Sequence, residues 1–101
     1  MSPSRPSISD ITANSMTLSW NAPSTDGGSP VTSYVIEKKE PYGKWSQVAK
    51  TAEDSYKVTG LKEGQKYEFR VAAENKAGRG SFSEATAPTE AKVPYGRFKW
   101  T

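Results

Sequence analysis

The feature that most constrains this chain is a period-two alternation of apolar and polar residues, repeated in several short segments of its 101 residues. Tyr67, Phe69 and Val71 alternate with polar or small residues, and residues 15–20 and 33–39 show the same pattern. Such alternation is typical of a half-buried β-strand, whose side chains point in turn to the core and to water. Because no stretch has a sustained helical period, we predict an all-β fold.

Turn-forming residues separate these segments. Residues 22–30, 40–43, 62–64 and 75–80 are rich in Gly, Pro, Asp and Asn, which fix turns or tolerate a positive φ. About seven short strands follow from this spacing, and no helix is available to connect parallel strands. We therefore predict a sandwich of two antiparallel sheets with seven strands in total.

The inward positions of the alternating segments define the expected core. The second segment turns Trp20 inward together with Met16 and Leu18, and it turns Ser15 outward. Ile8 and Ile11 are three residues apart, so burying both requires a bulge or a kink in the first strand. The predicted structural core is Trp20, Tyr34, Ile36, Leu61, Tyr67, Phe69 and Val71.

Several of these residues resemble the anchors of a fibronectin type III domain, and the resemblance covers nearly the whole chain. They are Trp20, Tyr34 and the corner Leu61-x-x-Gly64-x-x-Tyr67. The resemblance implies an immunoglobulin-like sandwich in which the corner tyrosine hydroxyl bonds back to the backbone of the preceding loop. It also implies a domain over residues 1–93, followed by a linker or C-terminal tail at 94–101.

Within that family, two segments are similar to those of the giant muscle proteins titin, twitchin and myosin-binding protein C. They are Pro-Ser-Thr-Asp-Gly-Gly-Ser-Pro-Val at 23–31 and Tyr-Glu-Phe-Arg-Val-Ala-Ala-Glu-Asn-Lys-Ala-Gly at 67–78. Phe82 and Ala85 depart from the pattern, because they stand where those domains often carry Pro. We expect this departure to change how the last strand is held at the sheet edge.

The muscle resemblance implies a structural and protein-binding module that acts as a spacer and docking site along the thick filament of the sarcomere. The implied partners are neighbouring immunoglobulin-like and fibronectin type III domains, with myosin or another sarcomeric protein as the docking partner. The implied location is cytoplasmic, and the lack of cysteine and of an Asn-x-Ser/Thr sequon favours it. The alternative is an extracellular adhesion or receptor module.

The residue types present argue against catalysis. The chain has no His and no Cys, so neither a Ser-His-acid triad nor a Cys-His pair can form, and the commonest zinc ligands are missing. The adjacent acids Glu53 and Asp54 fit a solvated turn better than a catalytic carboxylate pair. We predict a non-enzymatic domain without metal or cofactor, which is compatible with a kinase domain elsewhere in a parent chain.

The charge distribution argues against nucleic acid as a partner. Three of the 14 basic residues lie in 91–101 without an acid, which leaves 11 basic against 11 acidic residues in 1–90. Lys and Glu are interspersed there, whereas nucleic-acid binders concentrate basic residues on one face. No apolar run is long enough to cross a membrane. We expect the isolated domain to be monomeric.

Four residues are candidates for binding a partner, each with a plainer alternative. Trp45 is either a binding aromatic on an edge strand or a side chain that packs over the sheet or its rim. Arg79 lies in Arg79-Gly80-Ser81, which lacks the Asp of an integrin ligand. Phe98 and Trp100 alternate with basic residues and suit a membrane surface, an acidic partner or strand addition, unless the end is disordered or vector-derived.

Overall fold

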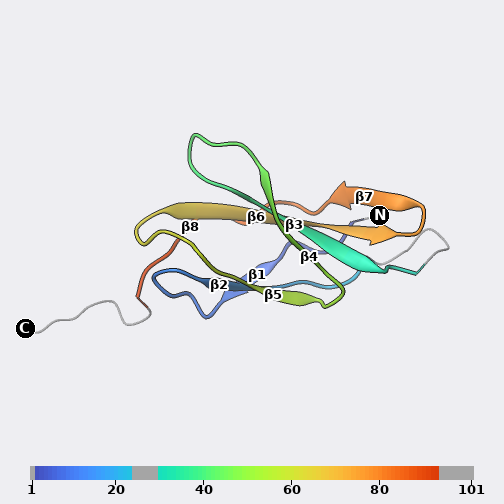
Figure 1. The fold of residues 1–101 in the computed structure, drawn as a ribbon, viewed down its shortest axis with the longest axis horizontal. Helices are drawn as coiled ribbons and strands as arrows, with labels where there is room; N and C mark the ends of the chain where they lie inside the picture. The colour runs from blue at the N-terminus through green and yellow to red at the C-terminus, as the bar shows by residue number, and fades with distance from the viewer. Residues whose placement is uncertain (1, 24–29, 94–101) are drawn as a thin grey trace, which may run out of the picture.

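The strands of this chain form two facing antiparallel sheets. The computed structural model describes residues 2–23 and 30–93, and those residues contain strands without a helix. One sheet has the order β1-β2-β5, formed by Ser7–Ser9, Met16–Ser19 and Ser55–Val58. Figure 1 shows this layer facing the layer that contains β3, β6 and β7. The predicted two-sheet sandwich is confirmed.

The second sheet has the order β4-β3-β6-β7, and β8 also pairs with β6. Its strands are β3 (Ser33–Lys39), β4 (Ser46–Thr51), β6 (Lys66–Asn75), β7 (Gly78–Phe82) and β8 (Thr89–Glu90). Strand β6 is the longest, and it pairs with β3 along seven consecutive residue pairs from Ser33↔Glu74 to Lys39↔Glu68. This long central pairing places the backbone of β6 at the middle of the sheet.

Strands β7 and β8 are two parts of one edge strand, interrupted over residues 83–88. Between them, the Ser83 N–H donates to the Val71 carbonyl at 2.7 Å and the Thr86 N–H donates to the Phe69 carbonyl at 2.9 Å. Counted as one, they bring the number of strands within residues 2–23 and 30–93 to the predicted seven.

The interrupted segment stays attached to β6 through two side-chain hydroxyls. The Val71 N–H donates to Ser83 Oγ and the Phe69 N–H donates to Thr86 Oγ1, each at 3.1 Å. Ser83 and Thr86 are both buried. Since a buried amide hydrogen needs an acceptor, the hydroxyls take the place of the backbone carbonyls that a regular strand would offer.

The core lies between the two sheets and contains all seven residues of the predicted core. Ile36, Phe69 and Val71 have no exposed surface, and the exposed fractions of Trp20, Tyr34, Leu61 and Tyr67 lie between 2% and 6%. The Trp20 and Tyr34 rings meet edge to face, with centroids 5.4 Å apart. Met16, Leu18, Val58, Ala73 and Ala91 complete this cluster.

The corner before β6 has the geometry that the resemblance implies. The Lys62 N–H donates to the Tyr67 hydroxyl oxygen at 2.8 Å, so the tyrosine side chain bonds back to the loop that precedes it. Gly64 has a φ of +87°, a conformation that an L side chain rarely adopts. The loop is also fixed to the residue directly after β8, because the Gly64 N–H donates to the Ala91 carbonyl at 2.8 Å.

The first strand ends in a kink instead of containing a bulge. Strand β1 pairs with β2 without a register shift, and Asp10, directly after it, has a left-handed φ of 49°. The turn at Asp10 lets Ile8 and Ile11 both pack against the core. The predicted outward position of Ser15 is wrong: Ser15 is buried in the following turn, where its Oγ lies 2.7 Å from Thr12 Oγ1.

Candidate protein-binding face

The sheet β4-β3-β6-β7 has a second face, directed away from the core, which we call the outer face. Its position follows from the register, because Val35 pairs with Ala72 of β6 and with Lys50 of β4, and Ala72 pairs with Phe82 of β7. Val35 and Ala72 are almost fully buried although they point away from the inter-sheet core. Larger side chains on this face therefore cover them. The outer face comprises Val35, Glu37, Trp45, Lys50, Arg70, Ala72, Glu74, Arg79 and Phe82.

Two aromatic rings and two guanidinium groups alternate across this face. The Arg70 Cζ lies 4.2 Å from the ring centroid of Trp45 and 4.2 Å from that of Phe82. The Arg79 Cζ lies 4.7 Å from the Phe82 centroid. We call these four residues the outer-face stack. Each cation–π contact at such a site contributes on the order of 0.5–1 kcal/mol, so the stack orders side chains that would otherwise be free in solvent.

Arg70 is fixed from a second direction by Glu37. Its Nε and Nη2 donate to the same carboxylate oxygen of Glu37, at 3.0 and 2.7 Å. Both side chains are partly buried. The two residues face each other across β3 and β6, where opposite charges in direct register stabilise the pairing. Arg70 is thus held by one carboxylate and two rings.

Glu74 forms the other charged cluster of the outer face. Its Oε1 lies 3.0 Å from Lys50 Nζ and accepts a hydrogen bond from Ser33 Oγ at 2.9 Å. These two contacts, Lys50 first, lower the pKa of the Glu74 carboxyl from its ordinary value of 4.5. The positive charge of Arg79 acts in the same direction. The ionised form is therefore the one that the folded chain prefers.

A lowered pKa of Glu74 predicts how this cluster responds to acid. Because the folded pKa lies below the unfolded one, the contribution of Glu74 to stability is complete above pH 4.5 and is lost as the pH falls through the folded pKa. We expect an NMR titration of the Glu74 carboxyl carbon to show this low pKa, and Lys50→Gln to raise it. A midpoint that is the same in the parent chain and in Lys50→Gln would contradict the assigned cause.

The structure brings two of the four candidate residues together. Trp45 and Arg79, distant in sequence, lie in the same outer-face stack, joined by Arg70 and Phe82. Trp45 is half-buried and packs over the sheet, which is the plainer of its two predicted positions. The other two candidates, Phe98 and Trp100, lie outside the described residues.

Sequence reasoning missed Arg70 and Phe82 as members of this face. The alternation of β6 places Arg70 outward, and an outward Phe on a neighbouring strand was the available signal. The pattern alone does not show which outward residues become cross-strand neighbours, because that depends on register.

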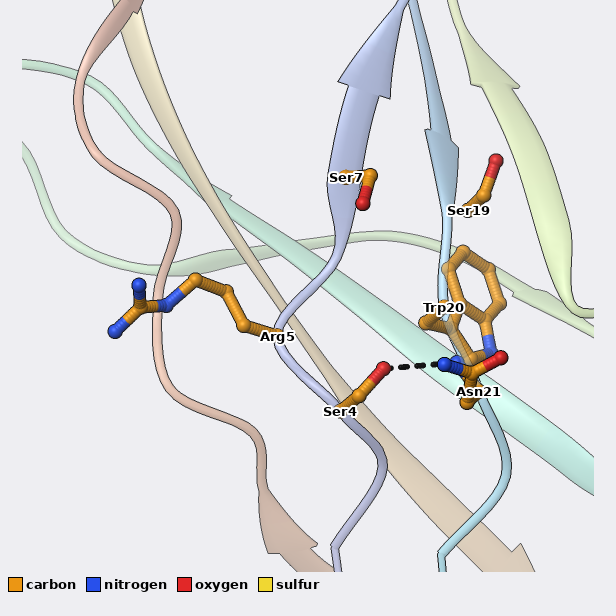
Figure 2. Close-up of a pocket in the computed structure, with 6 residues that line it drawn as sticks. All are labelled: Ser4, Arg5, Ser7, Ser19, Trp20 and Asn21. Carbon is orange, nitrogen blue, oxygen red and sulfur yellow. Dashed lines mark hydrogen bonds between the residues drawn. The ribbon is translucent and has the colours of Figure 1, made fainter.

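A shallow polar depression lies elsewhere, at the start of β1 and the end of β2 (Figure 2). Within it, the Asn21 N–H donates to Ser4 Oγ at 2.9 Å. The Arg5 side chain points away from the depression, and its guanidinium pairs with Glu84. The residues that line the depression offer hydroxyl and amide groups, and none of them has a carboxylate that could act as an acid or base. The lining residues are Ser4, Arg5, Ser7, Ser19, Trp20 and Asn21.

Within 2–23 and 30–93, no group of three or more His, Cys, Asp or Glu side chains is placed to hold a metal ion. The described part of the chain also has no helix long and apolar enough to cross a membrane.

Comparison with known proteins identifies the family of this chain and several similar proteins. Residues 1–89 match the model of the fibronectin type III domain. The chain is 42% identical over 81 residues to the titin homolog of Caenorhabditis elegans. The aligned segment covers 79% of this chain but, rounded, 0% of that protein. It is 36% identical over 89 residues to a Xenopus laevis protein named cell adhesion molecule-related/down-regulated by oncogenes, covering 85% of this chain and 7% of that protein.

Among solved structures, the twitchin kinase region from C. elegans superimposes with a TM-score of 0.85 and 39% identity. The match covers 98% of this chain and 18% of that one. The chain thus spans less than a tenth of the length of the two curated relatives.

Proposed function

This chain belongs to the fibronectin type III family, a non-catalytic fold, and on that premise we propose that it is a structural and protein-binding module of a large multidomain muscle protein. Its neighbours would be further immunoglobulin-like and fibronectin type III domains. Its place would be the sarcomere, in the cytoplasm. The observation that carries the proposal is the similarity to the titin homolog and to the twitchin kinase region along most of the chain.

The proposed spacer role is supported by the core packing and the strand pairing of the sandwich. The core is closed by residues with little or no exposed surface, and β6 is paired with β3 over seven consecutive residue pairs. These contacts must break together, so the domain holds a fixed length between its ends until it unfolds. Short linkers between such domains would then restrict the angles between neighbours.

The docking role is supported by the outer face. Aromatic residues and Arg are the residue types most enriched where proteins bind one another. The outer-face stack supplies two of each, already ordered by mutual contact. We therefore propose that myosin or another sarcomeric protein binds here.

A second candidate function is an adhesion or receptor module at the cell surface. It is favoured by the 36% identity to the cell adhesion molecule-related protein, which extends over 85% of this chain. The first function is preferred because the identity to the titin homolog is higher, at 42%.

Localising the parent protein separates the two. An antibody raised against this domain should label regular striations in permeabilised muscle fibres. Labelling of intact, unpermeabilised cells would contradict the sarcomeric function and support the surface one. Preabsorbing the antibody with the folded domain provides the control for specificity.

A further inference from the structure

Arg79 is a cation without an ion-pair partner in the described part of the chain. The ion pairs within 2–23 and 30–93 join Arg5 to Glu84, Lys38 to Glu40, Lys50 to Glu74 and Arg70 to Glu37. Arg79 takes part in none of these and is exposed, yet the Phe82 ring holds its guanidinium at 4.7 Å. Within the described residues, the Phe82 ring thus positions the donor groups of Arg79, and none of these ion pairs uses them.

Arg70 also has N–H donors that its contacts to Glu37 do not use. Its contacts to Glu37 employ Nε and Nη2, and both go to one oxygen of the carboxylate. A guanidinium has five N–H donors, and in the described part of the chain no side chain or carbonyl accepts from Nη1, so this group is open to an external acceptor. Arg70 and Arg79 lie against the same Phe82 ring, which brings two sets of unused donors to one place.

The stack reduces what binding would cost in entropy. A free arginine side chain loses on the order of 2 kcal/mol of rotamer freedom when it is fixed by a ligand. Here the rings of Trp45 and Phe82 and the carboxylate of Glu37 already hold Arg70. A ligand that meets these donors finds them preorganised.

The charges of the face indicate what kind of anion fits. Lys50, Arg70 and Arg79 stand against Glu37 and Glu74, so the outer face has a small excess of positive charge. A polyanion such as nucleic acid would meet the two acids as well, and it needs a denser row of cations. The carboxylates of an acidic protein segment match the free donors of the two arginines.

We propose that the outer-face stack binds an acidic segment of a partner protein, whose Asp or Glu carboxylates meet Arg79 and the free Nη1 group of Arg70. This inference rests on the protein-binding function proposed above and names the chemistry of the partner. It also gives the stack a role in recognition in addition to covering Val35 and Ala72.

An NMR titration of the 15N-labelled full chain with a hexaglutamate peptide tests the proposal, with hexaglutamine as the neutral control peptide. Hexaglutamate should shift the indole N–H signal of Trp45 and the Nε–H signals of Arg70 and Arg79, and it should leave the indole signal of buried Trp20 in place. The shifts should shrink with added salt, because exposed charge pairs are screened. An unmoved Trp45 signal, or equal shifts with hexaglutamine, would overturn the proposal.

Two matched variants show whether the stack or the general charge is responsible. Arg79→Gln should weaken hexaglutamate binding about fivefold, the effect of one exposed charge pair. Lys57→Gln removes an exposed cation from β5 in the other sheet and should change the affinity by less than about twofold. Equal weakening by both variants, or tighter binding of a sulfated oligosaccharide than of hexaglutamate, would refute an acidic protein segment as the ligand. Neither result would change the striated antibody labelling expected of a muscle module. The proposal of an acidic ligand and the proposed sarcomeric function can therefore fail independently.

Discussion

Replacing Trp20 with Ala is expected to lower the free energy of unfolding by about 3–5 kcal/mol, whereas the same replacement of Trp45 should lower it by only about 1 kcal/mol. Trp20 is 4% exposed and packs edge to face on Tyr34 between the two sheets, so its loss leaves a cavity that the sandwich cannot close. Trp45 is half-buried on the outer face, and its loss removes one cation–π contact with Arg70.

The two variants delete identical atoms, so the difference between them reflects the surroundings of the two rings. Urea unfolding should be followed by far-UV circular dichroism, because each variant removes a fluorescent tryptophan. In a domain of this length, a loss of 3–5 kcal/mol corresponds to a fall in melting temperature of more than about 12 °C. Equal losses in the two variants, or a Trp20→Ala chain that melts like the parent, would show that the assignment of inner and outer faces is wrong.

The core could be predicted because alternation is a direct consequence of strand geometry. Once Tyr67, Phe69 and Val71 occupy one side of a strand, a slip of a single residue would expose all three. The burial of these residues and of Ile36 therefore depends on a pattern that is local in sequence. The same holds for the corner at Tyr67, whose hydrogen bond to Lys62 spans five residues.

The outer face could be predicted only in part, because a two-faced pattern does not distinguish a solvated side from one covered by its own side chains. Ala72 stands at an outward position, yet it is fully buried beside Val35. Trp45 and Arg79 were found from residue type alone. Their connection through Arg70 and Phe82 depends on cross-strand register, including the shift between Ile36 and Glu37 in the β3–β4 pairing.

The turn residues show a further limit of pattern reading. The alternation places Ser15 outward as the first residue of its strand, but the strand begins only at Met16 and the Ser15 hydroxyl pairs with that of Thr12 in the preceding turn. Ser83 and Thr86 carry no apolar signal, although both are buried. In each case a hydroxyl satisfies the hydrogen-bonding need of a buried polar group. The hydrophobic pattern of a sequence does not predict which hydroxyls form such bonds.

Removing both hydroxyls from the interrupted edge strand, in the double variant Ser83→Ala and Thr86→Val, is expected to lower the free energy of unfolding by about 2–4 kcal/mol. Each hydroxyl accepts a hydrogen bond of 3.1 Å from a buried amide of β6. An orphaned buried donor costs about 1–3 kcal/mol, and the two sites are close enough for their effects to be less than additive. Val keeps the shape of Thr, so packing around residue 86 changes little.

Amide hydrogen exchange identifies the mechanism of that loss. The N–H groups of Phe69 and Val71 should exchange faster than those of neighbouring β6 residues that bond to β3, because only the former lose their acceptors. The matched control, Ser81→Ala with Thr59→Val, deletes the same atoms at exposed positions and should change stability by less than about 0.5 kcal/mol. If Phe69 and Val71 stay protected in the double variant, backbone pairing alone holds the last strand, and the hydroxyls are not the acceptors that stabilise it.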